Sequence, residues 1–566
     1  MKKKIILCGL LTFILASCSN SAVLTTSTKS DISTTTNKSD TSITSNKSDT
    51  SITSNKSDTS TTSAKSDTTT STKKQESEVV NLDIISLNDT HGYEYESSFN
   101  SNYNLANFSY YVEEKRNEKD NNVVVIANGD MFQGTAFSNL SHGKSAINAM
   151  NEVGFDMMGI GNHEFDWTLD SILSYFDNDE TNGEANFPLI NGNVKDSTIN
   201  GRIGESDTTD NILPYTIVQK GDLNVGLLSY IGDQTESICK NKFGSYYIDC
   251  SGSSDKNFIQ TVKSDAKTLK TLGADVIILN FHEGSSEGVD KLYYNQAFAN
   301  LKDDSGDYLI DAVINGHTHT SQSGEIKRDG GANLPIVQAY ANCNGFGEIL
   351  LSYDLETKSV VNVSCDSYML SDKVSSDEKN KKVEDVLEHE YSLIKNDISE
   401  VYATSYQYAS KSAIGNWLTN IMKRYCSSDI AIMNTGGIRA TMDSGNITIE
   451  ELYKVNPFDN ALVYLKVKGS ELKDFYDSNQ GYYYYNSDFN YTSIDDSLEY
   501  NLVTIDFVYY GSYFQKSFKN AVLVDIDTNV CARDLMVLDL KSKKTEGLYI
   551  NTCEPTLESH SFPQIK

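Results

Sequence analysis

The chain has 566 residues, which is too long for a single hydrophobic core and corresponds to about three domains. It contains 78 acidic and 48 basic residues and carries a formal net charge of −30. A globule this acidic repels nucleic-acid polymers, which excludes them as partners. A small anionic substrate would have to be attracted by local positive charge, such as metal ions and a few arginines.

The N-terminus carries the pattern of a secretory signal. Three lysines at positions 2–4 precede an apolar run over residues 5–14, which is too short to span a bilayer as a mature helix. The sequence Leu15-Ala16-Ser17-Cys18 that follows resembles the lipobox of bacterial lipoproteins. It implies a signal peptide over residues 1–18 and a lipid anchor on Cys18 at the extracellular face of the bacterial membrane. A plain secreted protein with an incidental cysteine is the alternative.

Residues 19–78 are of low complexity. The sequence of residues 37–45 recurs from Asn46 and, in altered form, from Asn55 and Ala64. The segment has almost no apolar side chains, so burial cannot offset the entropy lost on ordering. We therefore expect a disordered tether that holds a globular region away from the membrane. Without residues 1–78, the chain retains 38 basic and 71 acidic residues.

Hydrophobic patterning in the first half predicts alternating strands and helices, as in a parallel α/β sheet. The expected strands cover residues 79–87, 123–127, 155–160, 274–281 and 310–314, and the expected helices cover residues 144–153 and 257–272. Each of these strands is followed by a polar turn. Five of the eight histidines lie in these turns. Open α/β sheets place their chemistry at the carboxyl ends of strands, so we expect these turns to form one site.

The residue types in these turns are metal ligands. Asp89 and His91 are two residues apart, as are His317 and His319, and both spacings suit a shared cation. Asp130, at another strand end, can bridge two metals. Taken alone, a His-x-His pair is compatible with a solvated loop, and Asn162-His163-Glu164 with a helix-capping turn. The clustering of the histidines favours a metal site.

These motifs, in order, resemble the five motifs of calcineurin-like metallophosphoesterases. They are Asp89-x-His91, Gly129-Asp130, Gly161-Asn162-His163-Glu164, His282 and Gly316-His317-x-His319. The longer sequences Asn88-Asp89-Thr90-His91-Gly92 and Asn162-His163-Glu164-Phe165-Asp166 narrow the resemblance to the 5'-nucleotidase family. The likeness covers roughly residues 80–530.

The resemblance implies two divalent ions, of Zn, Mn, Co or Mg. One ion would be held by Asp89, His91, Asp130 and His319, and the other by Asp130, Asn162, His282 and His317. It also implies that His163, oriented by Asp166, stabilises the transition state or protonates the leaving oxygen. These two residues are three apart, so they can face each other across one turn.

In the second half, residues 371–400 are charged and helix-prone and are expected to connect two domains. A helix over residues 413–425 and a strand over residues 429–433 are followed by Asn434-Thr435-Gly436-Gly437-Ile438-Arg439. Glycines let a ligand approach the backbone, and Arg439 can bind an anion through its planar guanidinium. This segment resembles the Asn-x-Gly-Gly-Ile-Arg signature of the family's substrate domain, and Asn456-Pro457-Phe458-Asp459-Asn460 matches the next motif.

By this resemblance, Asn434, Gly436 and Arg439 bind the substrate. Two stacking aromatic residues are expected at Tyr483, within the run of tyrosines at positions 482–485, and at Phe507. The tyrosine run is equally compatible with the surface of a β-strand.

Two positions depart from the family. The stretch over residues 406–415, where the family has a second anion-binding arginine, contains only Lys411 as a base. Ser512 stands where the family has an aspartate that binds a sugar hydroxyl. These departures predict relatively weak binding of nucleotides, with deoxyribose substrates disfavoured less than in relatives that keep the aspartate. Stacking barely distinguishes one base from another, so the range of nucleotides hydrolysed should be broad.

The resemblance implies an α/β protein with two folded domains. An N-terminal four-layer α-β-β-α metallophosphoesterase sandwich is expected over residues 79–368 and a linker helix over residues 369–400. A C-terminal α/β 5'-nucleotidase substrate-binding domain is expected over residues 401–556.

Cysteine spacing allows disulfides. Apart from Cys8 and Cys18 the chain has seven cysteines, six of which are near in sequence as Cys239 with Cys250, Cys343 with Cys365, and Cys531 with Cys553. Outside the cell such pairs can form disulfides, with Cys426 left over. The alternative is seven unpaired buried thiols.

The leading interpretation is a surface-anchored 5'-nucleotidase that releases phosphate from extracellular nucleotides, so that nucleosides can be taken up. The same metal pair would support a 2',3'-cyclic nucleotide phosphodiesterase or a nucleotide-sugar pyrophosphohydrolase. A non-enzymatic surface adhesin would have no need for seven metal ligands together with His163 and Asp166.

Overall fold

The structure, a computed structural model, describes residues 78–96, 102–179, 181–205, 211–234, 242–250, 256–543, 547–550 and 555–557. The predicted signal peptide and the predicted tether up to residue 77 lie outside the described residues. Within the described part of the chain, no helix has both the length and the hydropathy needed to cross a bilayer.

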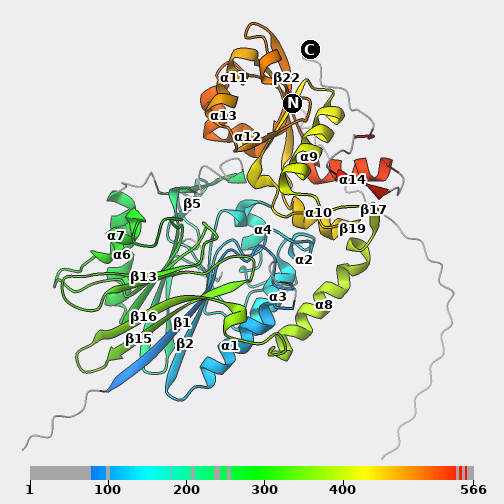
Figure 1. Ribbon diagram of the computed structural model, residues 1–566. Helices are drawn as coiled ribbons and strands as arrows, with labels where there is room; N and C mark the ends of the chain where they lie inside the picture. Colours follow the sequence, from blue (N-terminus) through cyan, green and yellow to red (C-terminus); the bar gives the residue numbers. More distant parts are fainter. Residues whose placement is uncertain are drawn as a thin grey trace, which may run out of the picture. The chain divides into compact units, whose positions relative to one another are not determined.

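Two β-sheets form the centre of the N-terminal domain (Figure 1). The seven-stranded sheet has the order β16-β15-β1-β2-β3-β4-β7 and the six-stranded sheet the order β13-β14-β12-β11-β9-β8. The strands of the first sheet are β1 (Val79–Leu87), β2 (Asn121–Asn128), β3 (Met157–Gly159), β4 (Leu189–Ile190), β7 (Ile212–Leu213), β15 (Gly345–Asp354) and β16 (Ser359–Met369). Those of the second are β8 (Tyr215–Lys220), β9 (Leu223–Ile231), β11 (Val276–His282), β12 (Ala312–Asn315), β13 (Gln322–Ile326) and β14 (Leu334–Gln338). A small third sheet joins β10 (Tyr246–Ile248), β5 (Val194–Asp196) and β6 (Gly201–Arg202).

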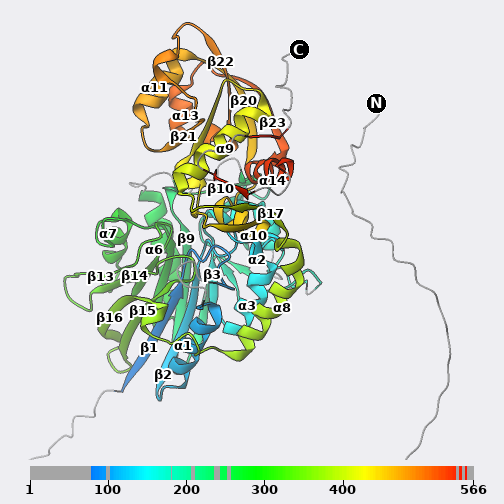
Figure 2. The same ribbon diagram turned by 45° about the vertical axis from the view of Figure 1, so that its right-hand side comes forward.

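An apolar core lies between the two large sheets. Ile84 of β1 and Val124 of β2 belong to one buried cluster with Val225 of β9 and Ile278 of β11. Helices cover the outer faces, because the same strands turn a second row of apolar side chains away from the partner sheet. Figure 2 shows α1, α3 and α8 along one side of the seven-stranded sheet and α6 and α7 beside the other sheet. The N-terminal domain therefore has four layers, in the order α-β-β-α.

The helices of this domain are α1 (Leu105–Asn117), α2 (Ala136–Asn139), α3 (Lys144–Val153), α4 (Leu169–Leu173), α6 (Lys256–Thr271) and α7 (Tyr293–Ala299). Three short 3₁₀ turns are described in the chain up to residue 437: η1 (His163–Phe165), η3 (Leu370–Asp372) and η4 (Thr435–Gly437). A further one, η5, covers Tyr491–Ser493.

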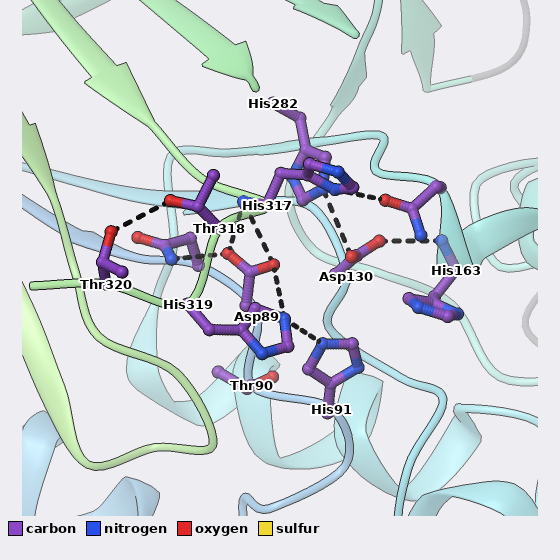
Figure 3. A network of polar contacts seen from close by, with 12 residues as sticks. Asp89, Thr90, His91, Asp130, His163, His282, His317, Thr318, His319 and Thr320 are labelled. Atoms are coloured by element: carbon purple, nitrogen blue, oxygen red, sulfur yellow. Dashed lines mark hydrogen bonds and ion pairs between the residues drawn. The ribbon is translucent and has the colours of Figure 1, made fainter. Parts of the chain in front are cut away.

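Parallel pairing brings the polar turns together. Strand β2 runs parallel to both β1 and β3, and β11 runs parallel to β12. Parallel strands end at the same edge of a sheet, so the turns that follow them share one edge in each sheet. The two edges lie side by side, since the turns of both sheets contribute to the site in Figure 3. The strands that carry the predicted motifs are thus present, in the predicted order.

Helix α8 (Lys381–Ile398) follows the N-terminal domain. It begins later than residue 371, where the sequence predicts a helical segment. Asn380 is its N-cap, and the Asn380 side chain accepts a hydrogen bond from the Lys382 N–H. A side-chain cap of this kind satisfies a backbone donor that the first helical turn leaves unpaired, which defines the start of the helix.

The C-terminal domain is built on a five-stranded sheet with the order β21-β18-β22-β20-β23. Its strands are β18 (Ile430–Asn434), β20 (Ala461–Lys468), β21 (Tyr483–Tyr485), β22 (Glu499–Ile505) and β23 (Val522–Cys531). A small sheet joins β19 (Gly445–Thr448), β17 (Val401–Ser405) and β24 (Gly547–Leu548). The helices are α9 (Lys411–Cys426), α10 (Ile449–Val455), α11 (Gly469–Ser478), α12 (Asp506–Tyr510), α13 (Ser512–Ser517) and α14 (Ala532–Ser542). One separate buried cluster forms the core of this domain.

The prediction of a disulfide between Cys343 and Cys365 is wrong. Both thiols are free. The register of β15 and β16 places Cys365 opposite Ile349, six residues along the chain from Cys343. A disulfide requires the two Cα atoms to lie within about 7 Å of each other. The other two predicted pairs each include a cysteine outside the described residues, at positions 239 and 553.

Candidate metal centre and substrate pocket

Two groups of potential metal ligands meet at the strand ends. Asp89, His91, Asp130 and His319 form one group, and Asp130, His282 and His317 form the other, with the ligand atoms of each group within 4.8 Å of one another. Asn162 joins the second group, because its Oδ1 lies 2.8 Å from Nδ1 of His317. Figure 3 shows the Asp89 and Asp130 carboxylates pointing toward the histidine rings. The structure therefore brings together all seven side chains predicted as ligands, and Asp130 is common to both groups.

The backbone of these turns is unusual. Asp89, His91, Asp130, His317 and His319 all have positive φ angles, between 51° and 73°. This left-handed region is unfavourable for residues with a Cβ and is found mainly where function requires it. At Gly161 there is no room for a side chain, since a Cβ would lie 2.4 Å from Oδ1 of Asp130. The tight turns thus direct side chains that are close in sequence into one small volume.

Two histidine rings, those of His91 and His282, are held in orientation by hydrogen bonds at Nδ1, the nitrogen that points away from the centre. Nδ1 of His91 lies 2.9 Å from the Gln133 carbonyl oxygen, and Nδ1 of His282 lies 2.6 Å from that of Asn128. A histidine held through Nδ1 presents Nε2 to a metal, as in most metalloproteins. Nε2 of His91 and Nε2 of His319 are only 3.0 Å apart, so both nitrogens converge on one point.

The charges of the site call for cations. Asp89 and Asp130 are buried, and within the described residues their ion-pair partners are histidines, at 3.3 Å in both cases. Nε2 of His282 is buried and faces the Asp130 carboxylate, and it has no further partner among the described residues. Buried carboxylates are stable only when they are paired or coordinate metal. The donor set of imidazoles, carboxylates and one amide oxygen fits divalent ions such as zinc or manganese.

The histidines differ in protonation. Burial and the neighbouring His282 lower the pKa of His317 to about 4, and burial together with His319 lowers that of His91 well below its ordinary value. Both are therefore neutral at pH 7, which is the form that binds metal. Although burial opposes it, the Asp130 carboxylate raises the pKa of His282 to about 10. Metal binding would release that proton.

His163 and Asp166 form a separate pair beside this centre. Nδ1 of His163 lies 2.8 Å from Oδ2 of Asp166, as their spacing predicts. The backbone N–H of His163 donates to Oδ1 of Asp130 at 2.7 Å, which fixes the turn against the centre. Although burial opposes it, the carboxylates of Asp166 and Asp130 raise the pKa of His163 above its ordinary value. The ring is thus positioned to give up a proton through Nε2.

Glu164 has a structural role that the sequence did not reveal. Its buried carboxylate accepts hydrogen bonds from the backbone N–H groups of Asp130, Met131 and Gly161, at 2.7–2.9 Å. It therefore ties the turn after β2 to the turn after β3. The sequence gave no sign of this role, because two of the three partners of Glu164 are backbone groups 33 and 34 residues away.

A cavity of about 360 Å³ opens onto the centre between the two domains. It is lined on one side by Asp130, Asn162, His163, Asp166, His317, Thr318 and His319, and on the other by Asn434, Gly436, Gly437, Arg439, Phe458, Asn460 and Phe507, with Lys242 at its edge. Four of the five predicted substrate residues are among them. Oδ1 of Asn434 is buried without a hydrogen-bond partner among the described residues, so it is available to a ligand donor.

Tyr483, the fifth predicted substrate residue, does not line this cavity. It lies on β21, and its ring packs against Phe475 with the ring centroids 4.8 Å apart. The aromatic residue that faces the cavity with Phe507 is Phe458, whose ring lies 5.0 Å from the Arg439 guanidinium. The motif around Phe458 was recognised in the sequence, but no stacking role was assigned to it. Lys242, whose Nζ lies 3.8 Å from Oδ2 of Asp506, was also missed.

The loop that carries Phe458 is held from two directions. Arg533 of α14 donates to the Asn456 carbonyl at 3.1 Å and forms an ion pair with Asp459. The side-chain amide of Asn139, from α2 of the N-terminal domain, donates to the Pro457 carbonyl at 2.9 Å. These contacts fix Phe458 at the boundary of the two domains.

Two family profiles match the chain, and together they span more than half of it. The calcineurin-like phosphoesterase profile matches residues 82–321, and the profile of the 5'-nucleotidase C-terminal domain matches residues 394–492. The first match contains the candidate metal centre, and the second contains Arg439 and Phe458.

Curated relatives and solved structures agree with these matches. The chain is 28% identical to "Endonuclease YhcR" of Bacillus subtilis (strain 168), over 70% of this chain and 32% of that protein. It is also 28% identical to the snake venom 5'-nucleotidase of Crotalus adamanteus, over 63% of this chain and 62% of the venom protein. It thus spans less than two thirds of the length of both relatives.

Among solved structures, the 5'-nucleotidase precursor from Thermus thermophilus superposes with a TM-score of 0.65 at 19% identity, covering 86% of this chain and 100% of that one. A putative 5'-nucleotidase from Staphylococcus aureus gives a TM-score of 0.63 at 17% identity, covering 85% and 99%. These similarities support the two-domain fold. The chain belongs to the 5'-nucleotidase family, in which a calcineurin-like metallophosphoesterase domain is joined to a 5'-nucleotidase C-terminal domain.

Proposed function

We propose that this protein is a dinuclear metal-dependent phosphohydrolase that releases phosphate from nucleotides. One observation carries the proposal. A single cavity is lined by four of the candidate metal ligands (Asp130, Asn162, His317 and His319), the His163–Asp166 pair, an arginine and two phenylalanine rings. This combination provides a site for the phosphate, a proton donor for the leaving oxygen and a planar slot for a base.

The two ligand groups would hold two divalent ions that share Asp130. When bound, such ions neutralise the phosphoryl oxygens and lower the pKa of the attacking water. The protein's own contribution is to fix the carboxylates and the imidazole nitrogens in place, through the strained turns and the hydrogen bonds to the rings.

The remaining roles follow from position. His163, with Nδ1 held by Asp166, donates a proton from Nε2 to the ester oxygen as it leaves. Arg439 binds a phosphate oxygen by a charge-assisted hydrogen bond. Phe458 and Phe507 hold the base between flat apolar surfaces, which suits any base and predicts a broad substrate range.

The function is tested by phosphate release from AMP, dAMP, GMP and UMP and from glycerol 3-phosphate, with Mn, Zn, Co or Mg. We expect Phe458→Ala and Phe507→Ala each to lower kcat/KM for AMP by about tenfold to a hundredfold, since base stacking contributes about 1–3 kcal/mol. In Phe507→Ala the rate with glycerol 3-phosphate, which has no base, should not change. In Phe458→Ala that rate should fall less than the rate with AMP, because the Phe458 ring also packs against His163 and Arg439.

Tyr482→Ala is the matched control, because this aromatic residue is 70% exposed and lies outside the cavity. It should leave both substrates unaffected. If wild type cleaves glycerol 3-phosphate as well as AMP and neither phenylalanine matters, the C-terminal domain does not bind a base. The protein is then a general phosphohydrolase.

We also propose that the enzyme is anchored to the outer face of the bacterial membrane through Cys18, with residues 19–78 as a spacer, and that it supplies nucleosides for uptake. The sequence Leu15-Ala16-Ser17-Cys18 supports the anchor. The domain limits proposed above, residues 79–368 and 401–556 joined by residues 369–400, place all seven metal ligands in one domain and Arg439 in the other.

The anchor predicts the behaviour of Cys18→Ser. Activity should move from the membrane fraction to the medium, or an uncleaved precursor should accumulate, while turnover per molecule stays the same. Cys8→Ser is the control, since this cysteine lies inside the apolar run of the signal and receives no lipid. Membrane partition of Cys18→Ser equal to that of the wild type would rule out lipid attachment at this residue.

A further inference from the structure

A second cavity, of about 720 Å³, also borders the metal centre. It shares His319 and Arg439 with the nucleotide cavity and reaches the centre through His91. Among the described residues that line it are neither His163 nor the two phenylalanine rings. Two cavities therefore border the centre, and of the two only the first is lined by the proton donor and the slot for a base.

The second cavity is cationic, although the chain as a whole is strongly acidic. Lys411, Lys454 and Arg439 line it, and Glu96 is the acidic residue among its lining side chains that the structure describes. Nζ of Lys454 lies 3.4 Å from the Glu96 carboxylate. In the part of the chain that the structure describes, Lys411 forms no ion pair. An excess of positive charge at such a place favours an anionic ligand.

Gln133 is a second, independent sign of a ligand. Its side chain lines the cavity and is 1% exposed, and neither its amide nitrogen nor its amide oxygen has a hydrogen-bond partner among the described residues. Buried side-chain amides are almost always paired, so an unpaired one points to a missing partner. Its backbone carbonyl meanwhile holds the His91 ring, which places this amide next to the metal centre.

We propose that Gln133, Lys411, Lys454 and the shared Arg439 form an anion subsite for a phosphate bonded to the reacting phosphorus on the side away from the nucleoside. The proposal rests on the proposed function and names its substrate class. A nucleoside monophosphate has nothing to place there. A nucleoside triphosphate does, when its β-phosphorus lies at the centre, its nucleoside and α-phosphate occupy the first cavity, and its γ-phosphate occupies the second.

The reaction in this binding mode is cleavage between the α- and β-phosphates. The oxygen of water forms a bond to the β-phosphorus, and the bond from that phosphorus to the bridging oxygen breaks. The bridging oxygen takes the proton of His163 and leaves on the nucleoside monophosphate. The proton lost by the water restores His163. The products are a nucleoside monophosphate and pyrophosphate, instead of a nucleoside diphosphate and orthophosphate.

The first test is the identity of the first products from ATP, followed by phosphorus NMR at early times with the metal-loaded full chain. We expect AMP and pyrophosphate without ADP. Appearance of ADP and orthophosphate first would overturn the proposal. If AMP itself is not hydrolysed by the same preparation, the proposed nucleotidase function fails instead, so the two failures are distinguishable.

The second test compares substrates in Lys411→Met and Lys454→Met. Each should lower the ratio of kcat/KM for ATP to kcat/KM for AMP by about tenfold, the effect of one charge-assisted hydrogen bond. Lys395→Met, at an exposed position on α8, should leave that ratio unchanged. A ratio unaltered in both cavity variants would exclude the subsite.

A binding measurement separates the subsite from catalysis. Calorimetry would use the bis-methylene analogue of ATP, in which neither anhydride bond can be cleaved, and α,β-methylene-ADP as the shorter probe. In Lys411→Met the triphosphate analogue should lose about tenfold in affinity and the diphosphate analogue should not. Equal losses of affinity for the two analogues would mean that Lys411 acts only by holding the structure at the domain boundary. That result would overturn the assignment.

Discussion

Asp130→Ala is expected to abolish binding of both metal ions and to lower kcat by at least about 10³-fold, since metal ions contribute several kcal/mol of transition-state stabilisation. Asp130 is the one carboxylate common to both ligand groups. Its removal leaves the first group with Asp89 and two histidines, and the second group with neutral ligands alone. No other single ligand should affect both sites.

The effect is measured as metal content per chain after gel filtration and as turnover of AMP over a range of Mn²⁺ concentrations. Asp130→Asn keeps the size of the side chain and should also lose metal, because the bridging position needs the charge. Asp290→Ala is the control, since this carboxylate is exposed and pairs only with Lys291 among the described residues. Two tightly held ions in purified Asp130→Ala would show that Asp130 does not bridge them.

Asp130 also has a structural role, and its effect on folding has to be distinguished from its effect on metal binding. Its Oδ1 accepts the backbone N–H of His163 at 2.7 Å, so the substitution loosens the turn after β3. The carboxylate of Glu164 still ties the two turns together through Gly161 and Met131. The variant should therefore fold, and its thermal unfolding without metal should remain cooperative. In the wild type, added metal should raise Tm, because it binds only the folded state.

Local patterns in the sequence were sufficient to predict that the seven candidate metal ligands lie together. Each ligand lies at the end of a strand whose apolar run is plain, and parallel pairing then brings the strand ends to one edge of each sheet. The predicted helix over residues 144–153 has the bounds of α3. These features depend on periodicity and on turns a few residues long, which a single sequence displays directly.

The substrate side was harder to predict, because it depends on contacts far apart in the chain. Phe458 reaches the cavity because Arg533 and Asn139, 77 and 318 residues from the groups they bind, hold its loop in place. Tyr483 is aromatic and in the expected region, but β21 pairs with β18 and directs its ring onto Phe475. The pairing of Cys343 with Cys365 failed for a related reason, since nearness in sequence says nothing about strand register.

His163→Ala is expected to lower kcat for AMP by about 10²–10⁴-fold while both metal ions remain bound, the usual contribution of a positioned proton-transfer group. The ring is not a member of either ligand group, and the backbone N–H that binds Asp130 survives the substitution. Asp166→Asn should have a smaller effect in the same direction, because the ring stays in place but loses the carboxylate that raises its pKa. Both variants should keep the wild-type metal content.

The role of His163 as a proton donor is distinguished from simple charge stabilisation by varying the leaving group. 4-Nitrophenolate is stable as an anion and leaves without a proton. The 5'-oxygen of a nucleoside has to be protonated as it leaves. The loss caused by His163→Ala should therefore be much smaller with 4-nitrophenyl phosphate than with AMP. Equal losses with both substrates would mean that His163 stabilises charge on the phosphoryl group instead. Loss of a metal ion from the variant would make His163 a ligand and would overturn the division of roles at this centre.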